Sequence, residues 1–377
     1  MIDEGETVVG GLTREVQEET GLLVTSWEGP LYEVEDFGEA FTPELRDREE
    51  RLRVDLLAPD PDGTPFQFSA DSTGPAPNPL YELYVLEDDK PRQLTDLTSR
   101  FARQAQLREV ERFTVPSTDG TVELDAWLLR PADHEEGKTY PLLLNVHGGP
   151  FTQYANRFFD EVQMQARAGY AVLWCNPRGS SGREEAFGRA ISGPPLGGTG
   201  WGTVDFDDVM AVLDHTLAQH SFVDRDRLGI LGGSYGGYMT SWAVSHTDRF
   251  RAACSERAAN NLLSLEWASD AAGAFRTGFG ISHLDDPEAY LRHSPVSYVK
   301  DIDTPLLIVH SEGDLRCPVE QGDQLFVALR MLEKDVEMVR FTGESHELSR
   351  SGSPAHRRQR MEVILEYFDR YLKEQAG

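Results

Sequence analysis

Basic residues are scarce in this chain of 377 residues: 36 lysines and arginines stand against 64 aspartates and glutamates, which gives a formal net charge of -28 at pH 7. A surface this acidic repels the phosphates of nucleic acids and the anionic headgroups of membranes, so neither is expected as a partner. High net charge of this kind is also typical of proteins from salt-rich cytoplasm. We therefore expect a halophilic source, with no nucleic-acid and no membrane partner.

Cysteine is rare as well, with Cys175, Cys254 and Cys317 the three in the chain and no C-x-x-C spacing among them. An odd number without a framework favours a reducing compartment over a disulfide-bonded secreted fold. No apolar run reaches the roughly 18 to 20 residues that a membrane span needs. The acidic N-terminus lacks a signal-peptide pattern. Together these absences predict a cytoplasmic protein.

The most informative stretch is the glycine-rich turn 232–236, Gly-Gly-Ser-Tyr-Gly. An apolar run over 227–231 predicts a buried strand before it, and 239–244 predicts a helix after it. Gly-x-Ser-x-Gly between a strand and a helix is the nucleophile-elbow pattern, in which a sharp turn exposes a serine hydroxyl at the start of a helix. The alternative is a glycine turn that only permits close packing, but the flanking elements and two partners downstream favour Ser234 as a nucleophile.

A serine nucleophile needs a base and a carboxylate that orients the base, and in α/β-hydrolases they follow the serine in the order acid, histidine. Asp314 comes after a predicted strand at 306–309, and His346 comes after a predicted strand at 336–341. Both residues are expected on loops at the carboxyl ends of strands, where folds of this class keep their chemistry.

The identity of the acid is open among three carboxylates, since Glu312 and Glu344 lie on the same loops as Asp314 and His346. Taken alone, Asp314 would be a turn or capping residue and His346 a surface residue. The neighbouring residues favour Asp314 and His346, and the choice between the acids depends on a family resemblance.

An early predicted strand, 142–146, ends in His147-Gly148-Gly149-Pro150. Loops of this HGG type supply one N–H group of the oxyanion hole in α/β-hydrolases. Gly149 can bring bare backbone close to a substrate oxygen, and the Tyr235 N–H would be the second donor. A tight glycine turn without this role is the alternative.

From about Arg108 onward, short apolar runs alternate with helical patterns, which predicts a parallel sheet covered on both faces. With the elbow, this predicts an α/β-hydrolase fold, doubly wound and mostly parallel, over 108–377. A small, partial β/α+β region precedes it. The expected strands are 142–146, 171–175, 228–231 and 306–309, and the expected helices are 159–167, 204–217, 321–332 and 360–372.

Five stretches carry a family resemblance: His147–Pro150, Cys175–Ser180, Gly232–Tyr238, Asp314–Pro318 and Gly343–Arg350. Together they resemble the acylaminoacyl-peptidase branch of the prolyl oligopeptidase family of serine peptidases, and the resemblance extends from about Tyr81 to the C-terminus. It implies Ser234 as nucleophile, Asp314 as orienting acid and His346 as base, with Gly149 and Tyr235 as oxyanion donors. Arg316 would hold the acyl or peptide carbonyl of the substrate. No metal ion and no cofactor are expected.

The chain departs from this family at three places. Arg183 stands where the family usually has an aromatic residue, and a glycine-rich stretch over 192–200 is added, which we expect to alter the rim of the site. Residues 61–107 leave room for a linker and about one propeller blade, whereas a closed propeller needs about four to eight. Because the family's propeller screens substrates by size, we expect wider access to the site and possible association into a homo-oligomer.

The N-terminal segment 1–60 carries a second motif. Glu6, followed by Arg14 to Leu22 with Glu15, Glu18 and Glu19, resembles a Nudix box, whose glutamates hold Mg²⁺ against a pyrophosphate. A solvated acidic helix is the alternative. The glycine that opens the box would fall before Met1 and the strands that precede the box are absent, so we expect a partial segment without a working site.

The predicted function is therefore a serine peptidase that hydrolyses peptide or acyl-aminoacyl bonds of short peptides through an acyl-enzyme, with an apolar pocket lined from 259–279. A carboxylesterase with the same triad is one alternative. An inactive truncated remnant and a Mg²⁺-dependent Nudix pyrophosphatase are the others.

Overall fold

The computed structural model divides the chain into two compact units, residues 1–105 and 106–377. The glutamates of the Nudix-like motif, Glu15, Glu18 and Glu19, lie outside the described residues, so that hypothesis stays a prediction. The structure describes residues 55–56, 67–71, 81–87, 90–105, 107–155 and 157–373.

The first unit contains a four-stranded antiparallel sheet in the order β1-β2-β3-β4, followed by helix α3. Strands β2 and β3 lie within 61–107, the segment expected to hold a linker and about one propeller blade. Four antiparallel strands are the content of one propeller blade. The elements are β1 (Asp55–Leu56), β2 (Gln67–Asp71), β3 (Tyr81–Glu87), β4 (Lys90–Gln93) and α3 (Ser99–Ala105).

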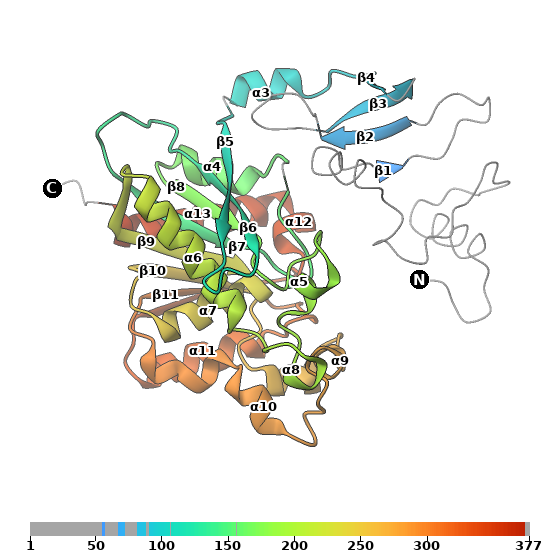
Figure 1. The fold of residues 1–377 in the computed structure, drawn as a ribbon. Helices are drawn as coiled ribbons and strands as arrows, with labels where there is room; N and C mark the ends of the chain where they lie inside the picture. The colour runs from blue at the N-terminus through green and yellow to red at the C-terminus, as the bar shows by residue number, and fades with distance from the viewer. Residues whose placement is uncertain are drawn as a thin grey trace. The chain divides into compact units, whose positions relative to one another are not determined.

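The second unit is built on an eight-stranded sheet in the order β12-β11-β10-β9-β7-β8-β6-β5 (Figure 1). Neighbouring strands from β12 to β8 are parallel, and β6 is antiparallel to both β8 and β5. This order confirms the predicted α/β architecture. The strands are β5 (Val110–Pro116), β6 (Glu123–Leu129), β7 (Tyr140–Val146), β8 (Ala171–Cys175), β9 (Val223–Gly233), β10 (Ala252–Glu256), β11 (Leu306–Ser311) and β12 (Val336–Phe341).

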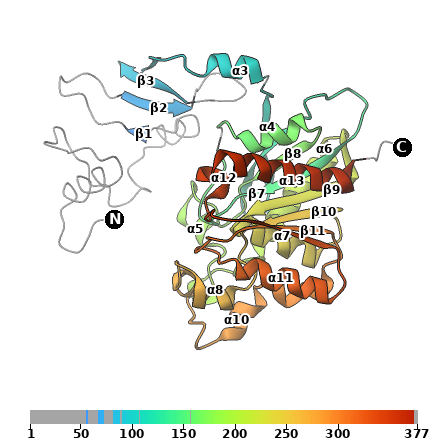
Figure 2. The same ribbon diagram turned by 180° about the vertical axis from the view of Figure 1, so that it is seen from behind.

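Helices cover both faces of this sheet. Figure 2 shows α4 and α13 across one face, and α6, α7 and α11 pack on the other. All four predicted helices are present, but α13 begins six residues before its predicted start at 360. Its N-cap is Ser353, whose hydroxyl accepts from the His356 N–H, and Pro354 is its first residue. The helices are α4 (Asp160–Arg167), α6 (Val204–Gln219), α7 (Tyr235–His246), α11 (Glu320–Met331) and α13 (Pro354–Leu372).

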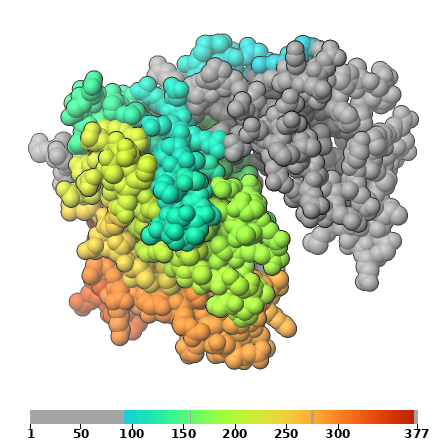
Figure 3. Space-filling model, viewed as in Figure 1, coloured from blue at the N-terminus to red at the C-terminus, as the bar shows by residue number. Residues whose placement is uncertain are grey.

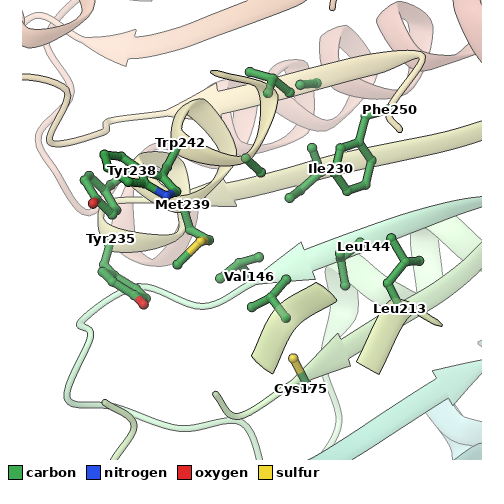
Figure 4. Close-up of a cluster of buried hydrophobic side chains, with 14 of the residues drawn as sticks. Leu144, Val146, Cys175, Leu213, Ile230, Tyr235, Tyr238, Met239, Trp242 and Phe250 are labelled. Atoms are coloured by element: carbon green, nitrogen blue, oxygen red, sulfur yellow. The ribbon is translucent and has the colours of Figure 1, made fainter. Parts of the chain in front are cut away.

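Burial of both sheet faces explains why the strands read as continuous apolar runs. In β7, Leu142, Leu144 and Val146 belong to one hydrophobic cluster, and Leu143 belongs to the other. Figure 4 shows part of the first cluster, with Val146 beside Met239 of α7. The ends of the strands are therefore held firmly, and loops that follow them are placed with little freedom.

Short helices occupy connections between the parallel strands and the segment between β12 and α13. The glycine-rich stretch 192–200 packs against α9: the Gly193 N–H donates to the Gly278 carbonyl at 2.9 Å, and a Cβ on Gly193 would lie 2.0 Å from the Phe279 carbonyl oxygen. Figure 3 shows the green and orange segments of this region in contact. These elements are α5 (Glu185–Arg189), η1 (Pro194–Leu196), α8 (Leu262–Ala268), α9 (Ala274–Phe279), α10 (Pro287–Arg292), η2 (Pro295–Asp301) and α12 (Leu348–Ser351).

Across the described residues, none of the helices combines the length and apolar character needed to cross a bilayer. The three cysteines Cys175, Cys254 and Cys317 are buried free thiols. They contribute to the packing of the second unit as small apolar side chains do.

The loop after β8 is anchored by a buried ion pair. The Arg178 Nε and Nη2 donate to the two carboxylate oxygens of Asp208 on α6, at 2.9 and 2.7 Å, and the Arg178 backbone N–H donates to the same group at 2.9 Å. Asp208 is fully buried, so its charge depends on this partner. The pair fixes the loop of 175–180 onto α6.

Replacing Arg178 by methionine should lower the free energy of unfolding by about 3–5 kcal/mol, because Asp208 would be left as an uncompensated buried charge. Urea unfolding followed by circular dichroism measures the loss. Arg249→Met is the matched control, since Arg249 pairs with the exposed Asp214 of the same helix. It should cost less than about 1 kcal/mol. Equal losses in the two variants would contradict the anchoring role of the buried pair.

Candidate active site

Ser234 lies between the end of β9 and the start of α7, with φ 62° and ψ -120°. A non-glycine residue at positive φ is strained, and such strain persists only where the surroundings impose it. Here the Ser234 N–H donates to the Glu256 carbonyl of β10 at 3.0 Å, and its own carbonyl accepts from the Tyr238 N–H at 2.9 Å. The serine is therefore held in a sharp turn at the head of a helix.

The two outer glycines of the turn are required by the carbonyl of Val146, the last residue of β7. A Cβ on Gly232 would lie 2.5 Å from the Val146 oxygen, and a Cβ on Gly236 would lie 2.0 Å from it. Real Cβ atoms do not approach a carbonyl oxygen so closely. The Gly-x-Ser-x-Gly spacing thus follows from the packing of the turn against β7.

Asp314 and His346 are brought together from the loops after β11 and β12. The His346 Nδ1 lies 2.7 Å from the Asp314 Oδ2, and the Asp314 Oδ1 accepts from the Cys317 N–H at 2.9 Å. The Asp314 side chain is fully buried, and 12% of the His346 side chain is exposed. An imidazole that donates from Nδ1 to a carboxylate leaves Nε2 free to act as a base.

The rival carboxylates point to other partners. Glu312 is exposed, and Glu344 accepts from the His356 Nδ1 at 2.6 Å and from the Ser353 N–H at 3.1 Å. Hydrogen bonds from these donors hold the pKa of Glu344 below its usual value. Among the described residues, no hydrogen bond or ion pair joins either acid to His346, so the geometry favours Asp314 as its partner.

The two loops that carry the acid and the histidine are joined through their backbones. The Gly313 N–H donates to the Glu344 carbonyl at 2.9 Å, and a Cβ on Gly313 would lie 2.8 Å from that oxygen. Behind the acid, the buried His310 places Nε2 2.8 Å from the Cys317 carbonyl and 3.6 Å from the Asp314 Oδ2. The pair of Asp314 and His346 is thus a supported unit.

The Cys317 thiol lies next to the Ser234 side chain, on the loop that also carries Asp314. Burial raises the pKa of Cys317 to about 12, so the group remains a thiol. Without a substrate, catalytic hydrogen bonds are often long or misaligned.

The HGG loop lies directly against the elbow. A Cβ on Gly148 would lie 3.1 Å from the Gly233 carbonyl oxygen and 3.4 Å from the Ser234 Cβ. Gly149 has φ 120°, and a Cβ there would meet the Phe151 N–H nitrogen at 2.8 Å. Backbone N–H groups of this loop are therefore close to the serine.

The second predicted donor, the Tyr235 N–H, belongs to the first residue of α7, where no intrahelical carbonyl is available to it. The Tyr235 side chain is buried, and its hydroxyl donates to the Asp205 Oδ2 at 2.6 Å. Asp205 also accepts from the backbone of Gly202 and Thr203, and its burial raises the pKa of its carboxyl to about 6.

Asp205 positions the Tyr235 side chain, and no sequence motif indicates this role. Its position in the first turn of α6 marks it only as a helix-start acid. Its contact with Tyr235 joins residues 30 apart in the sequence, which no local pattern reveals.

Arg316 lies at the exposed rim of the site, where its Nε donates to Asp270 at 2.6 Å. More than half of its side chain is exposed. In the segment predicted to line the pocket, Leu262, Leu265 and Phe279 belong to the core cluster, whereas Trp267 is 66% exposed. Among the described side chains of this segment, Trp267 is the large apolar one that is exposed.

His147 supports the HGG loop from within the protein. Its Nδ1 lies 2.7 Å from the Gly148 carbonyl, and its Nε2 lies 2.9 Å from the Ser180 hydroxyl. Burial lowers the pKa of His147 to about 4, so the imidazole is neutral near pH 7.

The chain is similar to several known proteins. Residues 156–375 match the prolyl oligopeptidase family. The uncharacterized peptidase YuxL from Bacillus subtilis is 38% identical over 359 residues, which cover 94% of this chain and 51% of YuxL. Acylaminoacyl peptidase from Pyrococcus horikoshii has 33% identity and a TM-score of 0.75, over 83% of this chain and 49% of its own.

A further similar structure is an acylaminoacyl peptidase in complex with Z-Gly-Gly-Phe-chloromethyl ketone. It has 32% identity and a TM-score of 0.78, over 87% of this chain and 51% of its own. The chain therefore spans about half the length of each of these three proteins. The likeness confirms the α/β-hydrolase fold and the predicted family.

Asp314→Asn should reduce turnover by about 10⁴-fold, because an amide favours the wrong tautomer of His346. Glu344→Gln is the matched control: it replaces an acid on the adjoining loop that serves His356, and it should retain most of the activity. Steady-state kinetics on a chromogenic peptide, with melting curves for both variants, compare them. A larger loss in Glu344→Gln than in Asp314→Asn would reverse the assignment of the acid.

The stability of the protein should fall in acid partly through His147. Its folded pKa of about 4 lies below an unfolded value of about 6.5, so its contribution is complete above pH 6.5 and is lost as the pH falls towards 4. Between pH 7.5 and pH 4.5, the wild type should lose about 2–3 kcal/mol more unfolding free energy than His147→Asn. Urea titrations at the two pH values measure this difference, and identical losses would assign the acid sensitivity to other groups.

Proposed function

The chain belongs to the prolyl oligopeptidase family of peptidases, and from that premise we propose that it is a serine peptidase that hydrolyses peptide or acyl-aminoacyl bonds of short peptides. Ser234 is the nucleophile, His346 the base and Asp314 the acid that orients the base. The observation that carries the proposal is the 2.7 Å contact of Asp314 with His346 on loops next to a strained serine elbow.

In the proposed acylation step, the Ser234 hydroxyl oxygen attacks the substrate carbonyl while His346 Nε2 takes its proton. The oxyanion accepts hydrogen bonds from the N–H groups of Gly149 and Tyr235, and losing one such donor costs about 3–4 kcal/mol in a comparable enzyme. His346 then gives the proton to the leaving amine, and the acyl group stays on Ser234. Water, activated by His346, releases the acid and restores the serine.

Two features support peptides as the substrate class. One of the similar acylaminoacyl peptidases is in complex with Z-Gly-Gly-Phe-chloromethyl ketone, whose name contains a Gly-Gly-Phe sequence. The exposed Trp267 and Phe151 give the region around the site apolar contact surface. Arg316 is proposed to hold a substrate carbonyl from the rim, with its Nε occupied by Asp270. A carboxylesterase would use the same machinery, so ester and peptide substrates must be compared.

Ser234→Ala should reduce hydrolysis of an acetyl-dipeptide p-nitroanilide by about 10⁶-fold, the loss expected when a triad nucleophile is removed. It should also abolish labelling by a fluorophosphonate. Ser221→Ala, at an exposed serine before β9, is the control and should retain both. Residual activity of Ser234→Ala near the wild-type level would exclude the proposed nucleophile.

The same assay separates the substrate classes. We measure kcat/KM for a p-nitroanilide and for the matched p-nitrophenyl ester. The wild type should hydrolyse the p-nitroanilide as well as the ester. Hydrolysis of the ester alone would identify the protein as an esterase.

A further inference from the structure

Arg257 follows the last residue of β10 and has φ 37°, one of three non-glycine residues with positive φ in the described chain. Its guanidinium lies against the elbow: a Cβ on Gly233 would lie 2.6 Å from the Arg257 Cζ. Gly233 directly precedes Ser234. The space that a side chain at position 233 would take is therefore filled by the Arg257 guanidinium.

This cation lacks hydrogen-bond acceptors within the part of the chain that the structure describes. Its Nε is buried without a partner, and the nearest ion-pair contact places Nη1 4.0 Å from the Glu256 Oε2. That distance exceeds a hydrogen bond. The side chain is only 11% exposed, so water replaces few of the missing acceptors. Burial accordingly lowers the pKa of Arg257.

The acids around Arg257 are already committed to other cations. Arg360 donates to both carboxylate oxygens of Glu256 and, through Nη1 and Nη2, to Glu161 at 3.0 and 3.1 Å. Glu347 accepts two hydrogen bonds from Arg350. Arg257 thus shares Glu256 with Arg360 at 4.0 Å, and no carboxylate among the described residues lies within hydrogen-bond distance of its guanidinium.

The position of Arg257 links it to the reacting groups. Burial raises the pKa of the Cys317 thiol, which contacts the Ser234 side chain, and the Arg257 charge opposes that rise; hydrogen bonds from Arg350 lower the pKa of Glu347, which follows His346, and Arg257 adds to that effect. It also lines a small cavity of about 10 Å³ together with Ser311 and Leu348, at the ends of β11 and of the histidine loop. The guanidinium therefore lies among the elbow, the acid loop and the histidine loop.

We propose that Arg257 binds a carboxylate of the substrate next to the scissile bond, so that the enzyme prefers peptides that place a negative charge there. A guanidinium recognises a carboxylate through two parallel N–H···O bonds, and a buried guanidinium without a hydrogen-bonded carboxylate gains most from such a partner. The carboxylate has two sources, the free C-terminus of a short peptide or an acidic side chain. The inference rests on the proposed peptidase function and adds a specificity residue to it.

The test uses two pairs of substrates whose cleavage is followed by the amine released. Acetyl-Ala-Ala against its C-terminal amide reports a free C-terminus, and acetyl-Asp-Ala-amide against acetyl-Asn-Ala-amide reports a side chain. A charged hydrogen bond corresponds to about a 10- to 100-fold preference in kcat/KM for the carboxylate member. We expect this preference in at least one pair with the wild type, and a ratio near one with Arg257→Gln.

Two further variants keep the result interpretable. Arg257→Lys retains the charge but loses the planar fork, and its ratio should lie between the other two. Arg358→Gln removes a cation from the exposed surface of α13 and should leave the ratio at the wild-type value. If Arg257→Gln does not fold, the kcat/KM ratios of the wild type and of Arg257→Lys test the role of Arg257: equal ratios would contradict it.

The outcomes distinguish a failure of the proposed peptidase function from a failure of the role proposed for Arg257. Cleavage of the neutral members by the wild type supports the peptidase function whatever the ratios are. A wild-type ratio near one in both pairs, or an undiminished ratio in Arg257→Gln, overturns the role of Arg257. No cleavage of any member overturns the peptidase function and the inference with it.

Discussion

The carbonyl oxygen of Val146 sets the geometry of the catalytic region, because the serine turn packs against it with no room for a side chain at Gly232 or Gly236. This contact fixes the distance between the end of β7 and the start of α7. The HGG loop continues from β7, so its backbone N–H groups reach the serine without any further device. The nucleophile and the groups proposed to stabilise the oxyanion are therefore positioned by adjacent strands of one sheet.

The acid and the base form a second, separately built unit. Both oxygens of Asp314 are engaged, one by the Cys317 N–H and one by His346, and the Gly313 contact holds the two loops together. This unit meets the serine through the Cys317 thiol in the arrangement described.

Much of the architecture could be predicted from the sequence, because the sheet is buried on both faces and its strands are continuous apolar runs. The start of α13 was misplaced because its cap, Ser353, precedes a polar first turn. Chain order placed Ser234, Asp314 and His346 on the loops where they occur, but it could not show the contact of Ser234 with Cys317. Asp205 and Arg257 were missed for the same physical reason: their roles depend on packing between segments that are distant in sequence.

The absence of a side chain at Gly233 also has an evolutionary consequence. The position before the serine in a Gly-x-Ser-x-Gly turn is written as variable, but here a side chain at 233 and the Arg257 guanidinium would occupy the same space. A larger residue at this position would displace the guanidinium from the elbow, and a smaller residue at 257 would open a void beside the serine. Substitutions at 233 and 257 should therefore occur together in descendants of this chain. The residue present at one position determines which residues the other position can accept.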